Sequence, residues 1–239
     1  MTDSSLILTP QDVLAATAIC RGTLEPALAG DWQIPAGARL GLAGPSGGGK
    51  STLLDLLYGL RPPLDGSLEL DETDSRGLRL LDWRSSAALV RVSEVFDGTI
   101  AENVKLGADL GSAEIRDCLK MAGLLDEVLS LPGALETRLT TGGRPLSDGQ
   151  MLRLMIARAV AQKPRLLLID EVLDRIEDGL ECSALVERLL DRNNPWTLVV
   201  ASTRPEVLSR CDAVFHLVNG KLECLPKVET TSLNSNRFA

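Results

Sequence analysis

The sequence contains few aromatic residues and no strongly basic stretch. Aromatic residues make up 3% of the 239 residues, and the formal net charge is −8. The hydrophobic 44% is therefore mainly aliphatic, and it is enough for one domain of generous size or a core with a smaller lobe. Because binding to nucleic acid requires a basic surface that neutralises phosphates, the acidic balance argues against a nucleic-acid partner.

Long apolar runs and paired cysteines are also missing. No signal peptide is recognisable, and no apolar run approaches the roughly 18 residues that a membrane-spanning helix needs. We therefore expect that the chain does not cross a membrane by itself and that any membrane association comes through a partner. The five cysteines lack C-x-x-C spacing, which disfavours a metal site or a disulfide framework and indicates a reducing, cytosolic compartment.

The stretch GPSGGGKST, residues 44–52, matches the phosphate-binding pattern G-x-x-x-x-G-K-[ST]. The apolar ARLGLAG before it predicts a strand, and STLLDLLYGL after it predicts a helix with leucines on one face. A flexible Gly/Ser linker is the alternative, and the strand–loop–helix context disfavours it. Backbone N–H groups and a helix N-terminus would then bind phosphate. The predicted nucleotide-binding residues are Gly44, Pro45, Ser46, Gly47, Gly48, Gly49, Lys50, Ser51 and Thr52, with Ser51 also on Mg²⁺.

Apolar patterns along the chain predict an α/β fold with a mostly parallel sheet. Four consecutive aliphatic residues in RLLLID, and the similar TLVVAS, are typical of strands covered by helices on both faces. A helical pattern over 96–131 suggests a lobe inserted between sheet elements. Asn219-Gly220 suggests the turn of a terminal hairpin. Strands are predicted at 5–8, 66–72, 87–92, 165–170 and 197–202, and residues 13–20 are a further candidate.

Two adjacent carboxylates, Asp170 and Glu171, end the apolar run RLLLID. Ligands of open α/β sheets bind at the carboxyl ends of strands, so Asp170 is placed to hold the Mg²⁺ that Ser51 also contacts. Glu171 can polarise a water molecule for attack on the outer phosphate. The alternative for Asp170 alone is a helix or turn cap, which the acidic pair downstream of a phosphate loop disfavours.

The stretch GGRPLSDGQMLRLMIARAVAQKPRLLLIDE, residues 142–171, resembles the ATP-binding-cassette (ABC) ATPases, which drive membrane transporters. Leu146 to Gln150 is similar to the family signature L-S-G-G-Q, with Asp148 in place of the third-position glycine. The resemblance covers roughly residues 12–226. It implies a P-loop NTPase (RecA-like) core, an N-terminal antiparallel β subdomain and an inserted helical lobe at about 96–160. In the family Ser147, Gly149 and Gln150 would face ATP held by a second chain, while Lys50 and Glu171 serve catalysis.

Two further stretches resemble the exporter-like branch of the family: FDGTIAENV at 96–104 and LPGALETRLTTGGRPLS at 131–147. The resemblance implies an integral membrane transporter domain as one partner. A second ABC ATPase chain, identical or different, is the other. It also implies a location on the cytoplasmic face of the membrane, reached through the membrane partner. We expect a single ABC ATPase domain over 1–228 and a flexible tail over 229–239, as a stand-alone subunit or as an excised domain.

The sequence departs from the family pattern at four positions. Val92 stands where the family has a glutamine that senses Mg²⁺, with Ser93 or Glu94 as substitutes. Thr203 replaces the switch histidine. The loop after Glu171 retains only an acidic end, in Asp174-Arg175-Ile176-Glu177, and no aromatic residue near Cys20 offers itself to stack on adenine.

The resemblance and the departures together suggest an ATP-hydrolysing, Mg²⁺-dependent subunit that powers export-type transport through ATP-driven dimerisation. The alternative is a degenerate subunit that binds ATP, completes a partner's site and hardly hydrolyses. A soluble ABC protein acting on DNA or ribosomes and a P-loop kinase of small molecules fit the sequence less well.

Overall fold

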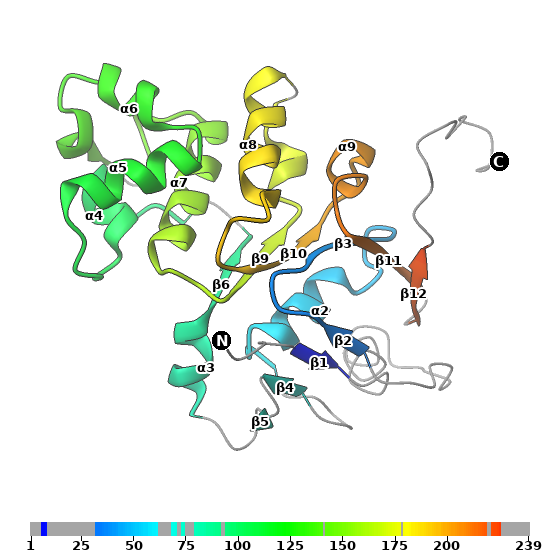
Figure 1. Cartoon of the computed structure of the whole chain (residues 1–239). Helices are drawn as coiled ribbons and strands as arrows, with labels where there is room; N and C mark the ends of the chain where they lie inside the picture. The colour runs from blue at the N-terminus through cyan, green and yellow to red at the C-terminus, as the bar shows by residue number, and fades with distance from the viewer. Residues whose placement is uncertain are drawn as a thin grey trace.

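The computed structural model of the chain describes residues 6–8, 32–61, 68–70, 73–74, 79–91, 94–140, 142–177, 179–218 and 221–225. Its centre is a six-stranded sheet with the strand order β12-β11-β3-β10-β9-β6 (Figure 1). The five strands from β6 to β11 run parallel to one another, and β12 is antiparallel to β11. The strands are β3 (Arg39–Ala43), β6 (Ala87–Val90), β9 (Leu166–Asp170), β10 (Thr197–Ala201), β11 (Ala213–Val218) and β12 (Lys221–Leu225). The predicted α/β class with a mostly parallel sheet is confirmed.

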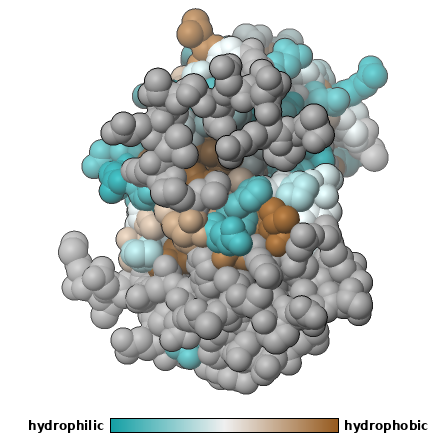
Figure 2. All heavy atoms as spheres, turned by 90° about the vertical axis from the view of Figure 1, so that its right-hand side faces the viewer, coloured by the Kyte–Doolittle hydropathy of each residue, from teal (hydrophilic) through white to brown (hydrophobic). Residues whose placement is uncertain are grey.

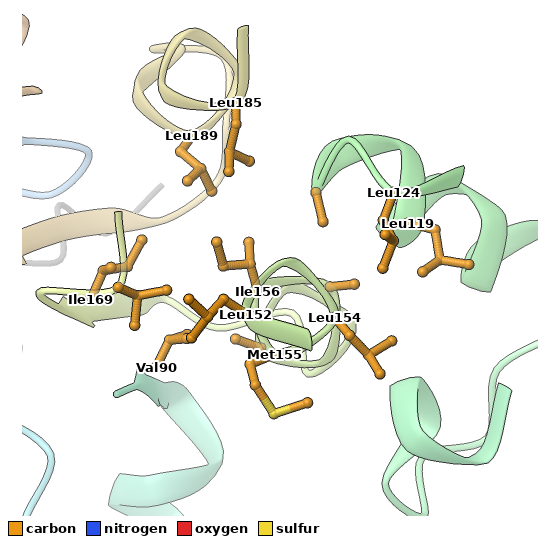
Figure 3. Packing of buried hydrophobic residues seen from close by; sticks show 14 of the residues in the cluster. Val90, Leu119, Leu124, Leu152, Leu154, Met155, Ile156, Ile169, Leu185 and Leu189 are labelled. Atoms are coloured by element: carbon orange, nitrogen blue, oxygen red, sulfur yellow. The ribbon is translucent and has the colours of Figure 1, made fainter. Parts of the chain in front are cut away.

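Both faces of the central strands are buried, as their continuous apolar runs predict. Successive residues of a strand point to opposite faces. In β9, Leu166 and Leu168 belong to one hydrophobic cluster, whereas Leu167 and Ile169 belong to the other. Figure 3 shows the second cluster, in which Ile169 lies among side chains from β6 and from neighbouring helices. Those labelled are Val90, Leu119, Leu124, Leu152, Leu154, Met155, Ile156, Leu185 and Leu189.

The helices cover the two faces unequally. The buried leucines of α2 (Lys50–Leu57) pack on one face, in the same cluster as Leu168. The buried residues of α7 (Asp148–Ala161), α8 (Leu180–Leu190) and α9 (Pro205–Leu208) belong to the cluster on the other face. One-turn helix η3 (Leu173–Arg175) follows β9. The arrangement leaves the carboxyl ends of β3, β9 and β10 side by side, and these ends carry the candidate site.

A helical region lies beyond β6 (Figure 1). It contains α4 (Ile100–Lys105), α5 (Ser112–Met121), α6 (Leu125–Ser130), one-turn helix η2 (Ala134–Glu136) and the start of α7. The prediction of helix throughout 96–131 is wrong at its beginning. There β7 (Gly98–Thr99) pairs with β8 (Arg138–Leu139), because Thr99 is extended as the N-cap of α4 and its side chain accepts from the Glu102 amide.

A small antiparallel sheet has the order β2-β1-β4-β5. It consists of β1 (Leu6–Leu8), β2 (Trp32–Ile34), β4 (Leu68–Leu70) and β5 (Thr73–Asp74), and α3 (Leu80–Ser86) leads from it into β6. The predicted antiparallel β subdomain is therefore confirmed. The strand candidate at 13–20 and the tail at 229–239 lie outside the described residues. So does the turn Asn219-Gly220, although Val218 pairs with Lys221 as a hairpin there requires.

Exposed hydrophobic side chains are scattered over the described surface. On the face in Figure 2, small hydrophobic groups alternate with hydrophilic ones among the coloured residues. Within the described ranges, no helix has both the length and the apolar character needed to cross a membrane. The large hydrophobic residues that are exposed are Leu60, Phe96, Leu106, Leu129 and Leu180.

Candidate functional site: a phosphate loop beside two carboxylates

The glycine-rich loop connects the end of β3 to the start of α2. Gly44 and Gly49 have φ angles of 142° and 103°, which favour glycine. At Gly44 a Cβ would also lie 2.3 Å from the carbonyl oxygen of Leu217 on β11. No acidic residue stands in the first turn of α2, so the partial positive charge of the helix N-terminus is not offset there. The loop therefore has the backbone geometry and the charge that favour an anion.

Lys50 is held inside this loop. Its side chain is 3% exposed, and its Nζ donates to the carbonyl oxygens of Gly44 at 2.9 Å and Pro45 at 3.1 Å. The same Nζ lies 3.0 Å from Oε1 of Glu171. The buried ammonium is thus positioned over the loop by backbone groups, while Glu171, at 38% exposure, is the partner that can move away when a phosphate binds.

Asp170 ends β9 next to the loop and is almost fully buried. Its Oδ1 has no hydrogen-bond partner among the described residues. A buried carboxylate oxygen without a partner is costly, and it fits a cation ligand. Ser51, whose side chain is exposed at the start of α2, supplies the hydroxyl of the predicted pair. Within the described ranges, no group of three or more His, Cys, Asp or Glu could hold a metal ion. The unpartnered carboxylate oxygen of Asp170 and the hydroxyl of Ser51 are hard oxygen ligands, which fit a Mg²⁺ ion that a nucleotide would also ligate.

Glu171 follows Asp170 in an uncommon backbone conformation. Its φ is 55°, in the left-handed region, and its amide donates to the carbonyl of Ala201 at 3.0 Å. For a residue other than glycine this conformation is uncommon and costs about 1–2 kcal/mol. The bend turns the carboxylate toward Lys50, which gives the site its second acid.

Arg91 is a site residue that the sequence did not single out. Val90 of β6 pairs in parallel with Ile169 of β9, so Arg91 lies beside Asp170. Its Nε donates to Oδ2 of Asp170 at 2.5 Å and its Nη1 to Oδ1 of Asp55 at 2.7 Å. Its Nη2 donates to the carbonyl of Ser51 at 3.0 Å. Partial burial lowers the pKa of Arg91, but the hydrogen bonds to the two carboxylates outweigh burial and raise it overall, so the guanidinium stays charged.

The signature residues form the N-terminus of α7. Ser147 is the N-cap, and its Oγ accepts from the amide of Gln150 at 3.3 Å. The Gln150 side chain accepts from the Ser147 amide at 2.8 Å and donates to Glu127 at 2.7 Å. Gly149 has open space where a side chain would be. The polar contacts of Ser147 and Gln150 thus stay within the helical region. The first turn of α7 carries the acidic Asp148, so only the Ser147 hydroxyl and the backbone N–H groups of the helix start favour an anion there.

Thr203 follows β10 and contacts the loop after Glu171. Its amide donates to Oδ2 of Asp174 at 2.7 Å, and its Oγ1 donates to the same oxygen at 2.8 Å. Buried Ser202 donates to Oδ1 of Asp174. Both oxygens of this carboxylate therefore hold the segment that carries Thr203. The hydroxyl of Thr203 is already engaged.

A family model described as ABC transporter matches residues 29–174, which contain the phosphate loop, the signature residues and the acidic pair. The chain belongs to the ABC transporter family. The match confirms the resemblance seen in the sequence. The arrangement of loop, strand end and signature helix is therefore that of an ABC ATPase domain.

Two relatives of this ABC ATPase domain are much longer than the chain. The multidrug resistance protein sirA of Leptosphaeria maculans is 37% identical over 188 residues, which are 77% of this chain and 15% of that protein. The ATP-dependent lipid A-core flippase of Burkholderia orbicola is 35% identical over 194 residues, or 80% of this chain and 32% of the flippase. The chain thus spans less than two thirds of either relative.

A solved structure agrees with the exporter-like resemblance. The chain is similar to a bacterial Atm1-family ABC exporter with ATP bound, with a TM-score of 0.78 and 25% identity. The similarity covers 95% of this chain and 39% of the exporter chain.

Two sequence-based expectations about this ABC ATPase domain lie outside the described residues. They are Val92 in the place of the glutamine, with Ser93 as a substitute for it, and the missing aromatic near Cys20. Glu94, the other substitute, is described, and its carbonyl accepts from Arg158 at 2.7 Å. The residue after β6 that reaches Asp170 and Ser51 is instead Arg91. In the sequence, Arg91 appears only as a single basic residue after the apolar run AALV. Its neighbour β9, which ends in the carboxylate of Asp170, is visible only in the structure.

Proposed function

We propose that the chain binds ATP and hydrolyses it to ADP and phosphate, and so powers an export-type membrane transporter. The observation that carries the proposal is the convergence of Lys50, Asp170 and Glu171 around the phosphate loop. Lys50 Nζ lies 3.0 Å from Glu171 Oε1, so a cation that can bind the outer phosphate stands next to a carboxylate that can accept a proton.

Each residue has a role in the proposed reaction. Backbone N–H groups of residues 44–52 and Lys50 bind the phosphates, with Thr52 in the first turn of α2. Ser51 and Asp170 would hold Mg²⁺, which when bound would neutralise phosphate charge. Glu171 orients a water molecule and accepts its proton. The water oxygen forms a bond to the γ-phosphorus while the bond to the bridging oxygen breaks, and ADP leaves with the electron pair.

We also propose that a second ABC ATPase chain completes the site. Ser147 and Gly149 of one chain would donate hydrogen bonds to the ATP that the other chain holds. A serine hydroxyl can accept and donate at once, so its bond to the Gln150 amide leaves its own proton available. Gln150 is bound to Ser147 and Glu127, which supports an indirect contribution through the helix start.

The remaining parts of the proposal concern the whole protein. An integral membrane transporter domain would be the other partner, and the chain would lie on the cytoplasmic face of the membrane through it. Residues 1–228 would act as one ABC ATPase domain, with 229–239 as a tail. The names of the relatives, a multidrug resistance protein and a flippase, support a transport role. The alternative of a degenerate subunit has less support, because Lys50, Asp170 and Glu171 are all present.

The experiment is a phosphate-release assay with Mg²⁺ and ATP, on the chain alone and with a candidate membrane partner. Glu171→Gln removes the proton acceptor, so we expect turnover to fall on the order of 100-fold or more while ATP still binds. Glu223→Gln, which makes the same change at an exposed position on β12, is the control and should leave turnover unchanged. Equal turnover in wild type and Glu171→Gln would overturn the assignment. ATP binding without turnover in the wild type, even with the partner, would favour the degenerate subunit.

A further inference from the structure

The proposed metal site already contains a cation of the chain itself. Arg91 donates to Oδ2 of Asp170 and to the carbonyl of Ser51, the two residues that would hold Mg²⁺. The side chain of Asp170 is 3% exposed and that of Arg91 is 31% exposed. The carboxylate is therefore buried with a positive charge beside it, and only Oδ1 remains without a partner.

The position of Arg91 is fixed from three directions. The parallel register of β6 and β9 brings it next to Asp170. Asp55, in the buried face of α2, accepts from Nη1 at 2.7 Å, and the Ser51 carbonyl accepts from Nη2. Three hydrogen bonds from one planar guanidinium hold it in place more firmly than a single lysine contact would. The charge cannot move far when a nucleotide arrives.

A fixed guanidinium affects a nucleotide and a divalent cation in opposite ways. It attracts the phosphates, which carry clustered negative charge, and it repels a metal ion that must share Asp170. One carboxylate oxygen that is bound to the guanidinium is also a weaker metal ligand, because its charge is already compensated.

We propose that Arg91 is a specificity-determining residue that makes nucleotide binding less dependent on a divalent cation. This inference rests on the proposed nucleotide site, and it concerns which form of the nucleotide that site prefers. Arg91 supplies part of the positive charge that Mg²⁺ supplies elsewhere, so free ATP and metal-bound ATP bind with similar affinity.

The test measures binding of a fluorescent, non-hydrolysable ATP analogue, once with EDTA and once with excess Mn²⁺. The quantity of interest is the dissociation constant with EDTA divided by the dissociation constant with Mn²⁺. In the wild type we expect a ratio within a few-fold of one. In Arg91→Met and Arg91→Gln the dissociation constant with EDTA rises relative to that with Mn²⁺. The ratio then increases about ten-fold or more, the size expected for one charge in a partly buried site.

Three variants separate charge from structure. Arg91→Gln keeps a hydrogen-bond donor beside Asp170 without the charge, so it remains informative if Arg91→Met does not fold. Arg91→Lys keeps the charge and should retain the wild-type ratio. Arg61→Met removes the other arginine that contacts Asp55. Nε of Arg61 donates to Oδ2 of Asp55 at 3.2 Å, and the change leaves the contact between Arg91 and Asp170 in place. It should leave the ratio unchanged.

The outcomes distinguish this inference from the proposed function. If the wild type binds no analogue under either condition, the nucleotide site itself is wrong and the inference falls with it. If the analogue binds but Arg91→Gln and Arg91→Met keep the wild-type ratio, only the role of Arg91 is overturned. The same holds if Arg61→Met changes the ratio as much as they do.

Discussion

The phosphate loop and the start of α7 are both suited to anions, but they are built differently. At the loop, Lys50 is 3% exposed and is bound by two carbonyl oxygens and Glu171. At α7, Ser147 and Asp148 are exposed, and the polar contacts of Ser147 and Gln150 stay within the helical region. The first half of the site is surrounded by its own chain, whereas the second half faces outward.

This difference in burial indicates which half of the site binds ATP first. A buried ammonium with fixed partners can exchange one of them for phosphate within a single chain. An exposed helix start offers only partial charges and one hydroxyl, which are weak in water. It becomes effective when a second surface excludes the water. We therefore expect the loop to determine ATP affinity and α7 to determine association.

The largest expected effect is at the buried half. Replacing Lys50 with alanine removes the cation that offsets the phosphate charges, where shielding from water makes such contacts strongest. Binding of Mg-ATP should be lost, as measured with a fluorescent ATP analogue. Lys120→Ala, at an exposed position on α5, should bind normally. Unchanged affinity in Lys50→Ala would remove the phosphate-loop assignment.

An intermediate effect is expected at Thr203, which follows β10 and is bound to Asp174. Its hydroxyl donates to Asp174, and it is too short to replace a histidine that reaches the outer phosphate. Loss of one such donor costs about 3 kcal/mol of barrier, or roughly 100-fold in rate. Thr203→His should therefore raise ATP turnover measured with the membrane partner present.

Thr203→Val serves as the control for that experiment. It removes the hydrogen bond that the hydroxyl donates to Asp174 and keeps the one from the amide. The free energy of unfolding should fall by about 1 kcal/mol, and turnover should not rise. If Thr203→His leaves turnover flat or lowers it while ATP affinity is kept, the impaired-switch explanation is wrong.

The smallest expected effect concerns the base. The sequence offers no aromatic residue near Cys20, well upstream of the loop, to stack on adenine, and stacking of that kind is worth about 1–3 kcal/mol. GTP should then displace a bound ATP analogue nearly as well as ATP does. A large preference for ATP in this competition would show that the purine has a stacking partner, with Trp32 as the first candidate.

Local patterns in the sequence predicted the loop and the acidic pair. The glycines and the apolar runs on either side specify strand, loop and helix without help from distant residues. Asp170 and Glu171 were found because a buried strand must end where the apolar run ends. The helix layers on both faces of the sheet follow from the same apolar runs, because a strand that is apolar throughout must be covered on both faces.

Contacts between distant segments could not be predicted in the same way. Arg91 and Asp170 are 79 positions apart, and Asp174 and Thr203 are 29 apart. Each pair meets only because of the register of β6 and β10 with β9. The sequence shows the strands but not their order, so Arg91, which follows β6 and lies beside Asp170, remained hidden.

Association through the exposed half is the central claim, and the variant Glu171→Gln tests it most directly. Blocked hydrolysis keeps ATP in place, so light scattering should detect a monomer without nucleotide and a dimer with Mg-ATP. Gly149→Asp, added to this variant, places a second carboxylate beside Asp148 and fills the open space at the start of α7, so it should prevent dimerisation and leave ATP binding intact. Gly149 has room for the side chain. Ser112→Asp, a matched change at the start of α5, should have no effect. A dimer that persists with Gly149→Asp, or a monomer at all concentrations of the ATP-bound Glu171→Gln variant, would contradict a homodimer joined through α7.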